Sequence, residues 1–446
     1  MKTNEELEKF VSDLANMWHR QGFDMNDYIG SMLYVICLNK MLEGTRCKSP
    51  DYFDQVMELT KVLYRPSNSA DIIVLENSIT MVEEIYGIEQ QILNDILKPV
   101  RYQEDAWKKT FLDYVNILAN LNLSGDEHHQ IARQLIIVAG KGSVRSGDKI
   151  STQAVSELFR IAIDIKDGES VLDGTVGYGF SAMESIYGKD VEFTGIDINR
   201  QSLAVTALYL IISGIDKFHL MNEDFTAINS AGENDKVFMD IPFGMKINEL
   251  IGFQNVRARE WMDNEPCKDV EALLMAEGLS SLNKHGRMVT IVPQGILFRQ
   301  TKGLSTFRKN VVNKGMLKAV ISLPAVYNST SISTTMLIFE EGNKDILFID
   351  GSSFIQRERR SEAIISMENS AKLKHIIDNK EAIEDISFVV SNEEVLEVGD
   401  WSLAKYKPMN YEAKYRSISE INNELEENFI ELEILNEASK SNKLFR

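Results

Sequence analysis

The sequence predicts an α/β fold in three parts: a helical domain over residues 1–140, a sheet of seven strands over residues 141–345, and a C-terminal region over residues 346–446. Apolar residues recur at helical spacing through the first part, and from residue 170 short β-rich runs alternate with helical stretches. Such alternation is typical of a parallel sheet with helices on both faces. We therefore expect a helical domain followed by a doubly covered sheet.

Helices are predicted at 4–18, 27–42 and 111–121, where apolar side chains such as Leu7, Val11 and Leu14 share one helical face. The loop at 140–152 is rich in Gly, Ser and basic residues and marks the domain joint. Strands are predicted at 170–173, 191–198, 218–222, 236–240, 287–292, 317–323 and 334–341. No helix separates the last two, so the last strand is expected to run antiparallel.

The C-terminal region contains a further short strand at 346–350 and a terminal helix. Apolar residues from Ile418 to Leu435 fall at three- and four-residue steps, and Ser417 with Glu420 suits a capping box at the helix start. An apolar stripe must pack on something: by default on the rest of its own chain, or alternatively on a partner helix, so this helix is also a candidate for docking a partner subunit.

Composition limits the classes of function. Hydrophobic residues make up 44% of the chain, so a large core can form, and the net charge is −19. DNA phosphates repel an acidic protein, so acting on DNA would need a local basic patch or a partner. The sequence has no apolar run of the roughly 18 residues that span a membrane and no apolar signal core, and its three cysteines lack metal-ligand spacing. We expect a cytoplasmic protein without a metal site.

A glycine-rich loop follows the first strand. Asp173 ends the strand, and Gly174, Thr175, Gly177 and Gly179 lead into a helix. The loop lacks the third glycine of the dinucleotide fingerprint, so a pyrophosphate is not indicated. A carboxylate at this place suits a cofactor with a cationic amino acid end.

Two further acids end the next strands. Asp197, followed by Ile198, lies where a carboxylate accepts the hydroxyls of a ribose. Asp224, followed by Phe225, could accept a proton from an adenine amino group. A single Asp at a strand end is usually a turn residue, but three at successive strand ends indicate a ligand site.

The fourth strand ends in the turn Asp240, Ile241, Pro242, Phe243. This turn offers a carboxylate, a backbone carbonyl and an aromatic face at the ligand edge of the sheet. Acceptors that hold the hydrogens of an aromatic amine would free its lone pair for attack on a methyl group. Phe243 would stack on a base swung out of the duplex. The turn is therefore the predicted catalytic element.

At these segments the chain resembles the modification subunits of type I restriction–modification systems, which are N6-adenine DNA methyltransferases. The resemblance is specific at VLDGTVGYGF, TGIDINRQSLAVTALYLIISGI, DIPFG and LPAVYNSTSISTTMLIFEE. It implies a Rossmann-like sheet with a reversed last strand and S-adenosylmethionine as the cofactor. It also implies that Asp173, Gly177 and Gly179 hold the cofactor, Asp197 its ribose and Asp224 its adenine. Asp240, Pro242 and Phe243 would be catalytic.

The chain departs from the family pattern in three places. Asp240 and Ile241 stand where the family usually has Asn and Pro, Gly174 replaces a Pro, and the family's Thr-Pro element appears as Thr152-Gln153. Ile241 lacks the locked φ of a proline. The resemblance also implies DNA as substrate and a separate specificity subunit, and it is consistent with a restriction subunit and with a homodimer.

Three alternatives follow from the residues. A C5-cytosine methyltransferase needs a Pro-Cys nucleophile, and Pro266-Cys267 is present but lies beyond the fourth strand. A protein-glutamine methyltransferase has a similar turn after its fourth strand. The third alternative is a degenerate scaffold that binds cofactor or partner without transferring a methyl group.

Basic side chains that could contact DNA phosphates at the groove are those of Arg299, Lys302, Arg308 and Lys309.

Overall fold

The computed structural model describes ten stretches of the chain: residues 4–20, 25–44, 49–66, 68–121, 123–142, 151–228, 232–244, 256–328, 330–357 and 362–407. The predicted C-terminal helix with its stripe from Ile418 to Leu435 and its capping box lies outside them. Among the described residues, no helix is both long and apolar enough to cross a membrane.

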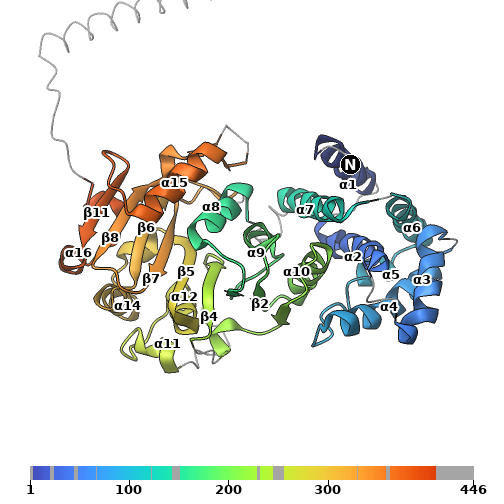
Figure 1. The fold of residues 1–446 in the computed structure, drawn as a ribbon, viewed down its shortest axis with the longest axis horizontal. Helices are drawn as coiled ribbons and strands as arrows, with labels where there is room; N and C mark the ends of the chain where they lie inside the picture. The colour runs from blue at the N-terminus through green and yellow to red at the C-terminus, as the bar shows by residue number, and fades with distance from the viewer. Residues whose placement is uncertain are drawn as a thin grey trace, which may run out of the picture. The chain divides into compact units, whose positions relative to one another are not determined.

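The N-terminal region is helical, as predicted (Figure 1). Its helices are α1 (Asn4–Arg20), α2 (Met25–Glu43), η2 (Pro50–Tyr52), α3 (Phe53–Tyr64), α4 (Asp71–Tyr86), α5 (Lys98–Arg101), α6 (Asp105–Ala119) and α7 (Gly125–Gly142). Helix α2 is buried along almost its whole length, which explains why its apolar run shows little amphipathic pattern. Trp18 of α1 packs on Phe111 and Tyr114 of α6.

The second region is built on a nine-stranded sheet in the order β11-β8-β6-β7-β5-β4-β1-β2-β3. Its strands are β1 (Ser170–Asp173), β2 (Glu192–Ile196), β3 (Phe218–Met221), β4 (Asn234–Asp240), β5 (Leu282–Pro293), β6 (Leu317–Leu323), β7 (Thr334–Glu340), β8 (Asp345–Asp350) and β11 (Ser387–Ser391). A separate antiparallel pair joins β9 (Ile355–Gln356) and β10 (Ile364–Ile365).

The seven predicted strands all form. The seventh, β7, pairs antiparallel with both β5 and β6, as its short connection predicted. The predicted count of seven is wrong, because β8 and β11 extend the sheet beyond residue 345. β8 pairs with β6 and β11 pairs with β8, so these strands bury apolar residues that the sequence assigned to a separate C-terminal region.

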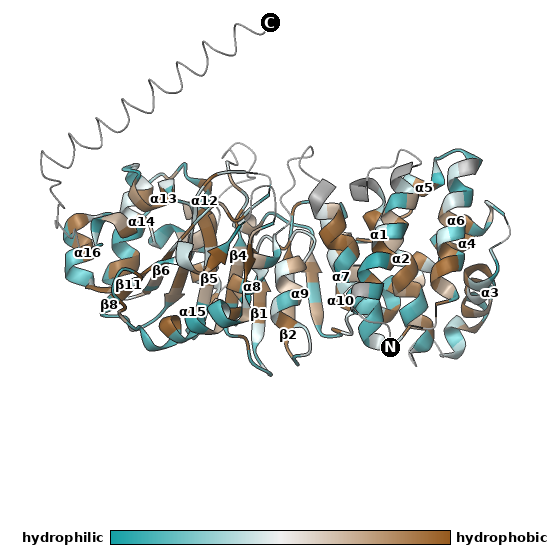
Figure 2. Cartoon of the chain, turned by 90° about the horizontal axis from the view of Figure 1, so that it is seen from above, coloured by the Kyte–Doolittle hydropathy of each residue, from teal (hydrophilic) through white to brown (hydrophobic). Residues whose placement is uncertain are grey.

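Helices cover both faces of the sheet. They are α8 (Gln153–Ile163), α9 (Phe180–Ile186), α10 (Arg200–Ile212), α11 (Val256–Glu260), α12 (Val270–Ser281), α13 (Gly295–Phe298), α14 (Lys302–Asn313), α15 (Met367–Asn379) and α16 (Asn392–Val398), with 3-10 turns η4 (Phe225–Ala227), η6 (Gly351–Ser353) and η7 (Leu403–Lys405). Figure 2 shows α14 on one side of the strands and α15 on the other.

Two apolar cores result from this layering. Along β1, Val171 packs into one core and Leu172 into the other, as the alternation of side chains in a strand requires. Leu373 of α15 belongs to the first core, and Phe307 of α14 belongs to the second. The near-continuous apolar strands are therefore buried on both faces.

The helical region packs on the sheet region through α10. Helices α2 and α7 contact it (Figure 1), and Arg133 of α7 forms a bidentate ion pair with Glu184 of α9 at 2.6 Å. The Arg200 guanidinium at the start of α10 donates to the backbone carbonyls of Gln90 and Gln91. Both glutamines have left-handed backbone conformations, so this arginine stabilises an unfavourable turn of the helical region.

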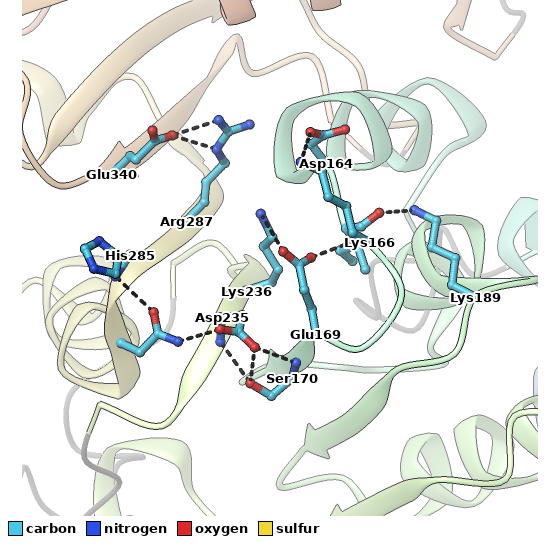
Figure 3. Close-up of polar contacts among 12 residues, drawn as sticks. Asp164, Lys166, Glu169, Ser170, Lys189, Asp235, Lys236, His285, Arg287 and Glu340 are labelled. Carbon is cyan, nitrogen blue, oxygen red and sulfur yellow. Dashed lines mark hydrogen bonds and ion pairs between the residues drawn. The ribbon is translucent and has the colours of Figure 1, made fainter.

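A charged network lies at the amino ends of the parallel strands (Figure 3). Arg287 of β5 and Lys318 of β6 share the carboxylate of Glu340, at 2.7 and 3.0 Å. Burial alone would raise the pKa of Glu340, but the two cations hold it below its usual range. Both cations are largely buried, so each depends on this carboxylate. The network stabilises the sheet at the edge opposite the strand ends that carry the acids.

Glu340→Gln should lower the free energy of unfolding by about 1–3 kcal/mol, a range discounted for the half-exposed carboxylate. Because the folded-state pKa is depressed, the stabilisation is present above the usual carboxyl pKa and is lost as the pH falls through the folded value. In urea unfolding, the free energies of unfolding of variant and wild type should therefore differ at pH 7 and become equal at acidic pH. Glu192→Gln, at an exposed position of β2, is the control. Equal stability at pH 7 would contradict the prediction.

Candidate active site

The predicted acids meet because of the strand register. Asp173 pairs with Gly195 of β2 and with Phe238 of β4, both parallel. Asp197 and Asp240 each lie two residues beyond those partners, on the same side of the sheet. Asp224 follows β3, the next parallel neighbour. The structure thus brings all four predicted acids to the carboxyl edge, where open parallel sheets bind ligands.

The glycine loop turns as its residues predict. Gly177 and Gly179 have φ values of +54° and +71°, which side chains other than glycine rarely adopt. A Cβ on Gly179 would lie 2.9 Å from Thr206 of α10, and one on Gly174 would lie 2.6 Å from the Phe225 ring. The loop backbone therefore packs closely on both neighbours and leaves space only on its outer side.

Asp197 organises the loop. Its two carboxylate oxygens accept hydrogen bonds from the backbone N–H groups of Gly177 at 2.8 Å and Asn199 at 2.7 Å. Asn199 in turn caps α10 by accepting from the N–H groups of Gln201 and Ser202. Each carboxylate oxygen has two acceptor positions, so Asp197 retains capacity for the hydroxyls of a ligand.

Asp224 caps the short turn η4. One of its oxygens accepts from both the N–H and the hydroxyl of Thr226, at 2.9 and 2.8 Å. The adjacent Phe225 is buried against Gly174. The side chain therefore has both the usual capping role of a strand-end Asp and a position at the cavity wall.

A cavity that opens to solvent lies against these residues; its empty volume, open solvent included, is about 410 Å³. Its walls come from the glycine loop, the two strand ends, the catalytic turn and α12: Gly174, Thr175, Asp197, Ile198, Glu223, Asp224, Phe225, Pro242 and Leu274. A neighbouring cavity is lined by Ser151, Asp173, Thr175, Val176, Gly177, Tyr178, Phe180, Ser181 and Asp240. Thr175 lines both, so the two form adjoining parts of one site.

Asp173 lies at the back of the second part and is almost fully buried. Thr175 donates its backbone N–H to the carboxylate at 3.0 Å. Burial, and then the charges of Asp197 and Asp240, raise the pKa of Asp173 well above its usual range. A cationic ligand group placed here would stabilise the charged carboxylate, so the acid fits the cationic end of an amino acid.

The predicted catalytic turn closes the site. Asp240 accepts hydrogen bonds from the hydroxyls of Ser151 at 2.6 Å and Tyr327 at 2.5 Å. Pro242 faces the first cavity, and Ile241 is buried in the core. Phe243 is partly exposed and meets the Tyr327 ring edge-on, with centroids 5.5 Å apart. The carboxylate, the turn and the aromatic ring are therefore at one place, as predicted.

Thr152 lies beside the site but does not line the two cavities. Its hydroxyl caps α8 and donates to the carbonyl of Val326 at 2.9 Å. Its neighbour Ser151 reaches Asp240 instead. Sequence reasoning missed Ser151, which directly precedes Thr152-Gln153, and Tyr327, which lies within the segment LPAVYNSTSISTTMLIFEE. Ile198 is largely exposed at the cavity rim.

Two other candidates are not supported. Burial raises the pKa of the Cys267 thiol to about 11, so it is not a reactive thiolate. Arg308 is buried and donates to the carbonyl of Ile296, so its expected contact with phosphates is wrong. Arg299 and Lys302 are paired with Asp269 and Glu265. No cluster of three metal-ligating side chains occurs in the described parts of the chain.

Fold and site together define a class. A glycine loop after the first strand, acids at successive strand ends and a reversed strand β7 are the features of a Rossmann-like methyltransferase fold. Within that class the chain belongs to the N-6 DNA methylase family, whose model matches residues 135–415. The match begins in α7 and includes every strand of the nine-stranded sheet.

Known proteins confirm the resemblance. The chain is 26% identical over 339 residues to the type I restriction enzyme MpnII methylase subunit of Mycoplasma pneumoniae. The matched part is 69% of this chain and 61% of that relative, so the chain spans less than two thirds of the relative's length.

Two solved structures share the fold. The type I restriction-modification system methyltransferase subunit of Streptococcus thermophilus gives a TM-score of 0.74 at 19% identity, over 91% of this chain and 99% of that one. A modification subunit of a putative type I restriction enzyme from Vibrio vulnificus gives 0.63 at 16% identity, over 93% and 99%. Both similarities include the helical region as well as the sheet.

Gly179→Ala should destabilise the protein more than Gly188→Ala. Both glycines have positive φ, but only Gly179 would place its Cβ against Thr206. Backbone strain alone costs about 1–3 kcal/mol, and the close contact adds to it at Gly179. Chemical denaturation of the two variants measures the difference. An equal loss of unfolding free energy in the two variants would show that the Thr206 side chain can move away from the new Cβ without an energetic penalty.

Proposed function

We propose that the protein transfers a methyl group from S-adenosylmethionine to the N6 amine of adenine in DNA, as the modification subunit of a type I restriction–modification system. The observation that carries this proposal is the meeting of Asp240 and Pro242 of the predicted catalytic turn with Asp173, Asp197 and Asp224 at two adjoining cavities. Membership of the N-6 DNA methylase family supports the choice of adenine.

The donor set fits the cofactor. Asp173 suits the ammonium of the amino acid end, Asp197 suits the ribose hydroxyls, and Asp224 with Phe225 suits the adenine. Gly174, Thr175 and Gly177 line the two adjoining cavities. Gly179 packs closely on Thr206 and gives the loop its turn into α9. When bound, S-adenosylmethionine supplies an electrophilic methyl group on a sulfonium sulfur.

The catalytic turn suits an aromatic amine. When ionised, the carboxylate of Asp240 can accept hydrogen bonds but cannot donate one, so it would bind an N–H hydrogen of the substrate amine. Moving the amine hydrogens out of the plane of the adenine ring directs the nitrogen lone pair toward the methyl group. Holding the two reactants in such a fixed geometry can lower the activation barrier by about 7–11 kcal/mol. Asp240 also accepts the proton that the amine loses. The partly exposed ring of Phe243 offers a surface on which the extruded base stacks.

A partner subunit would overcome the repulsion between this acidic chain and the phosphates of DNA. The net charge is −19, and three of the four basic residues first considered for DNA are buried or paired. We propose that a specificity subunit provides most phosphate contacts and that the helix predicted near the C-terminus docks it. A restriction subunit and a homodimer are further expected associations. Genomic DNA as substrate implies a cytoplasmic location.

The alternatives are less well supported. The high pKa of Cys267 opposes cytosine chemistry, and the family match opposes a protein-glutamine substrate. A degenerate scaffold does not require the four acids to converge.

Asp240→Ala should abolish N6-adenine methylation in cells, with a rate loss of at least about 100-fold. Long-read sequencing of host DNA from strains that carry the wild-type or variant gene measures the effect. Asp167→Ala, an exposed acid at the opposite edge of the sheet, is the matched control. Unchanged adenine methylation in the Asp240→Ala strain would falsify the catalytic assignment.

Asp197→Ala should weaken S-adenosylmethionine binding by about 10- to 100-fold, since hydrogen bonds to a charged acceptor contribute about 1.5–3 kcal/mol. Isothermal titration with the purified protein gives the dissociation constant directly. Glu192→Ala, at the other end of the same strand, controls for changes in β2. A variant that binds the cofactor as tightly as wild type would remove Asp197 from the site.

A further inference from the structure

The carboxylate of Asp240 is held from outside its own strand. Ser151 donates to Oδ2 at 2.6 Å, and Tyr327 donates to Oδ1 at 2.5 Å. Ser151 precedes α8, and Tyr327 lies between β6 and β7. Each oxygen therefore has one fixed hydroxyl donor, and the plane of the carboxylate is determined by two distant segments.

The two donors are also connected to each other. Thr152, next to Ser151, donates its hydroxyl to the carbonyl of Val326, next to Tyr327, at 2.9 Å. Arg357 fixes the Tyr327 segment further by donating to the carbonyl of Ala325 at 2.8 Å. The two hydroxyls therefore form a small braced unit around the carboxylate.

These hydrogen bonds restrain a side chain that its own turn does not fully fix. The residue directly after Asp240 is Ile241 and not a proline, so its φ is not fixed by a ring. Packing of the buried Ile241 side chain restrains the turn, but the carboxylate can still rotate about its own bonds. The hydrogen bonds of Ser151 and Tyr327 remove that freedom.

We infer that Ser151 and Tyr327 are positioning residues that together orient the Asp240 carboxylate toward the amine of the substrate. The inference rests on the proposed function. An ionised carboxylate has about four acceptor positions and no donor, so the group that Asp240 can hold is one that donates, such as the N–H of an amine. A nucleophile without an N–H or O–H hydrogen has nothing to donate to this acceptor.

Tyr327 suits the role for two further reasons. Burial, and then the charge of Asp240, raise the pKa of Tyr327 well above its usual range, so the phenol stays protonated and remains a donor. Its ring also stands edge-on to Phe243. Replacement by phenylalanine removes the donor and keeps this ring contact.

The test is steady-state kinetics of Tyr327→Phe and Ser151→Ala in the complete methylating complex, with S-adenosylmethionine and host DNA. For Tyr327→Phe we expect kcat to fall about 10- to 100-fold while KM for both substrates stays within about twofold of wild type. The double variant should lose less than the product of the single losses, because both hydroxyls act on one carboxylate.

Tyr114→Phe is the matched control. Tyr114 is equally buried and donates to the carbonyl of Met32 at 2.9 Å, in the helical region. It should lower the melting temperature about as much as Tyr327→Phe and leave kcat unchanged. If Tyr327→Phe unfolds at the assay temperature, Ser151→Ala tests the same role, because it should also lower kcat while KM stays near the wild-type value.

The outcomes separate the two proposals. Wild-type kcat in both Tyr327→Phe and Ser151→Ala, or a loss that appears only in KM, overturns the positioning role and leaves the proposed function intact. Absence of methyl transfer by the wild-type complex overturns both. A selective loss of kcat supports both.

Discussion

Parallel pairing of β1 with β2 and β4 is the constraint on which the site depends. Because Asp173 pairs with Gly195 on one side and Phe238 on the other, the acids two residues further along are brought to its two sides. A shift of one residue would turn Asp197 or Asp240 to the opposite face. The two apolar cores that fix this register therefore also fix the chemistry.

The same register concentrates negative charge. Asp173 has Asp197 and Asp240 close enough to affect its ionisation, and it is buried as well. Such an arrangement is unfavourable by itself, and it is typical of functional sites. Two kinds of group offset it here: backbone N–H donors from the glycine loop at Asp173 and Asp197, and hydroxyl donors at Asp240. A positively charged ligand would complete the compensation, and its affinity would then depend on the stability of the loop.

Much of this could be predicted from sequence, and the reasons are local. The strands at 170–173 and 317–323 were predicted with the observed bounds, because each is an apolar run. The acids were found because each lies at the end of a strand or within three residues of it. The brace around Asp240 was not found, since Tyr327 and Ser151 lie 87 and 89 residues away in the chain and follow no periodic pattern. The burial of Arg308 was missed for a related reason: its partner is a backbone carbonyl.

Arg200 connects the cofactor edge to the helical region. It lies three residues after Asp197 and holds the carbonyls of Gln90 and Gln91, which have strained backbone conformations. Asn222, just beyond β3, donates its backbone N–H to the Gln90 side chain at 2.8 Å. Swinging the helical region away from the sheet would break these bonds and release the strain of the turn. The residues that follow Asp197 and β3 therefore also hold the helical region against the sheet.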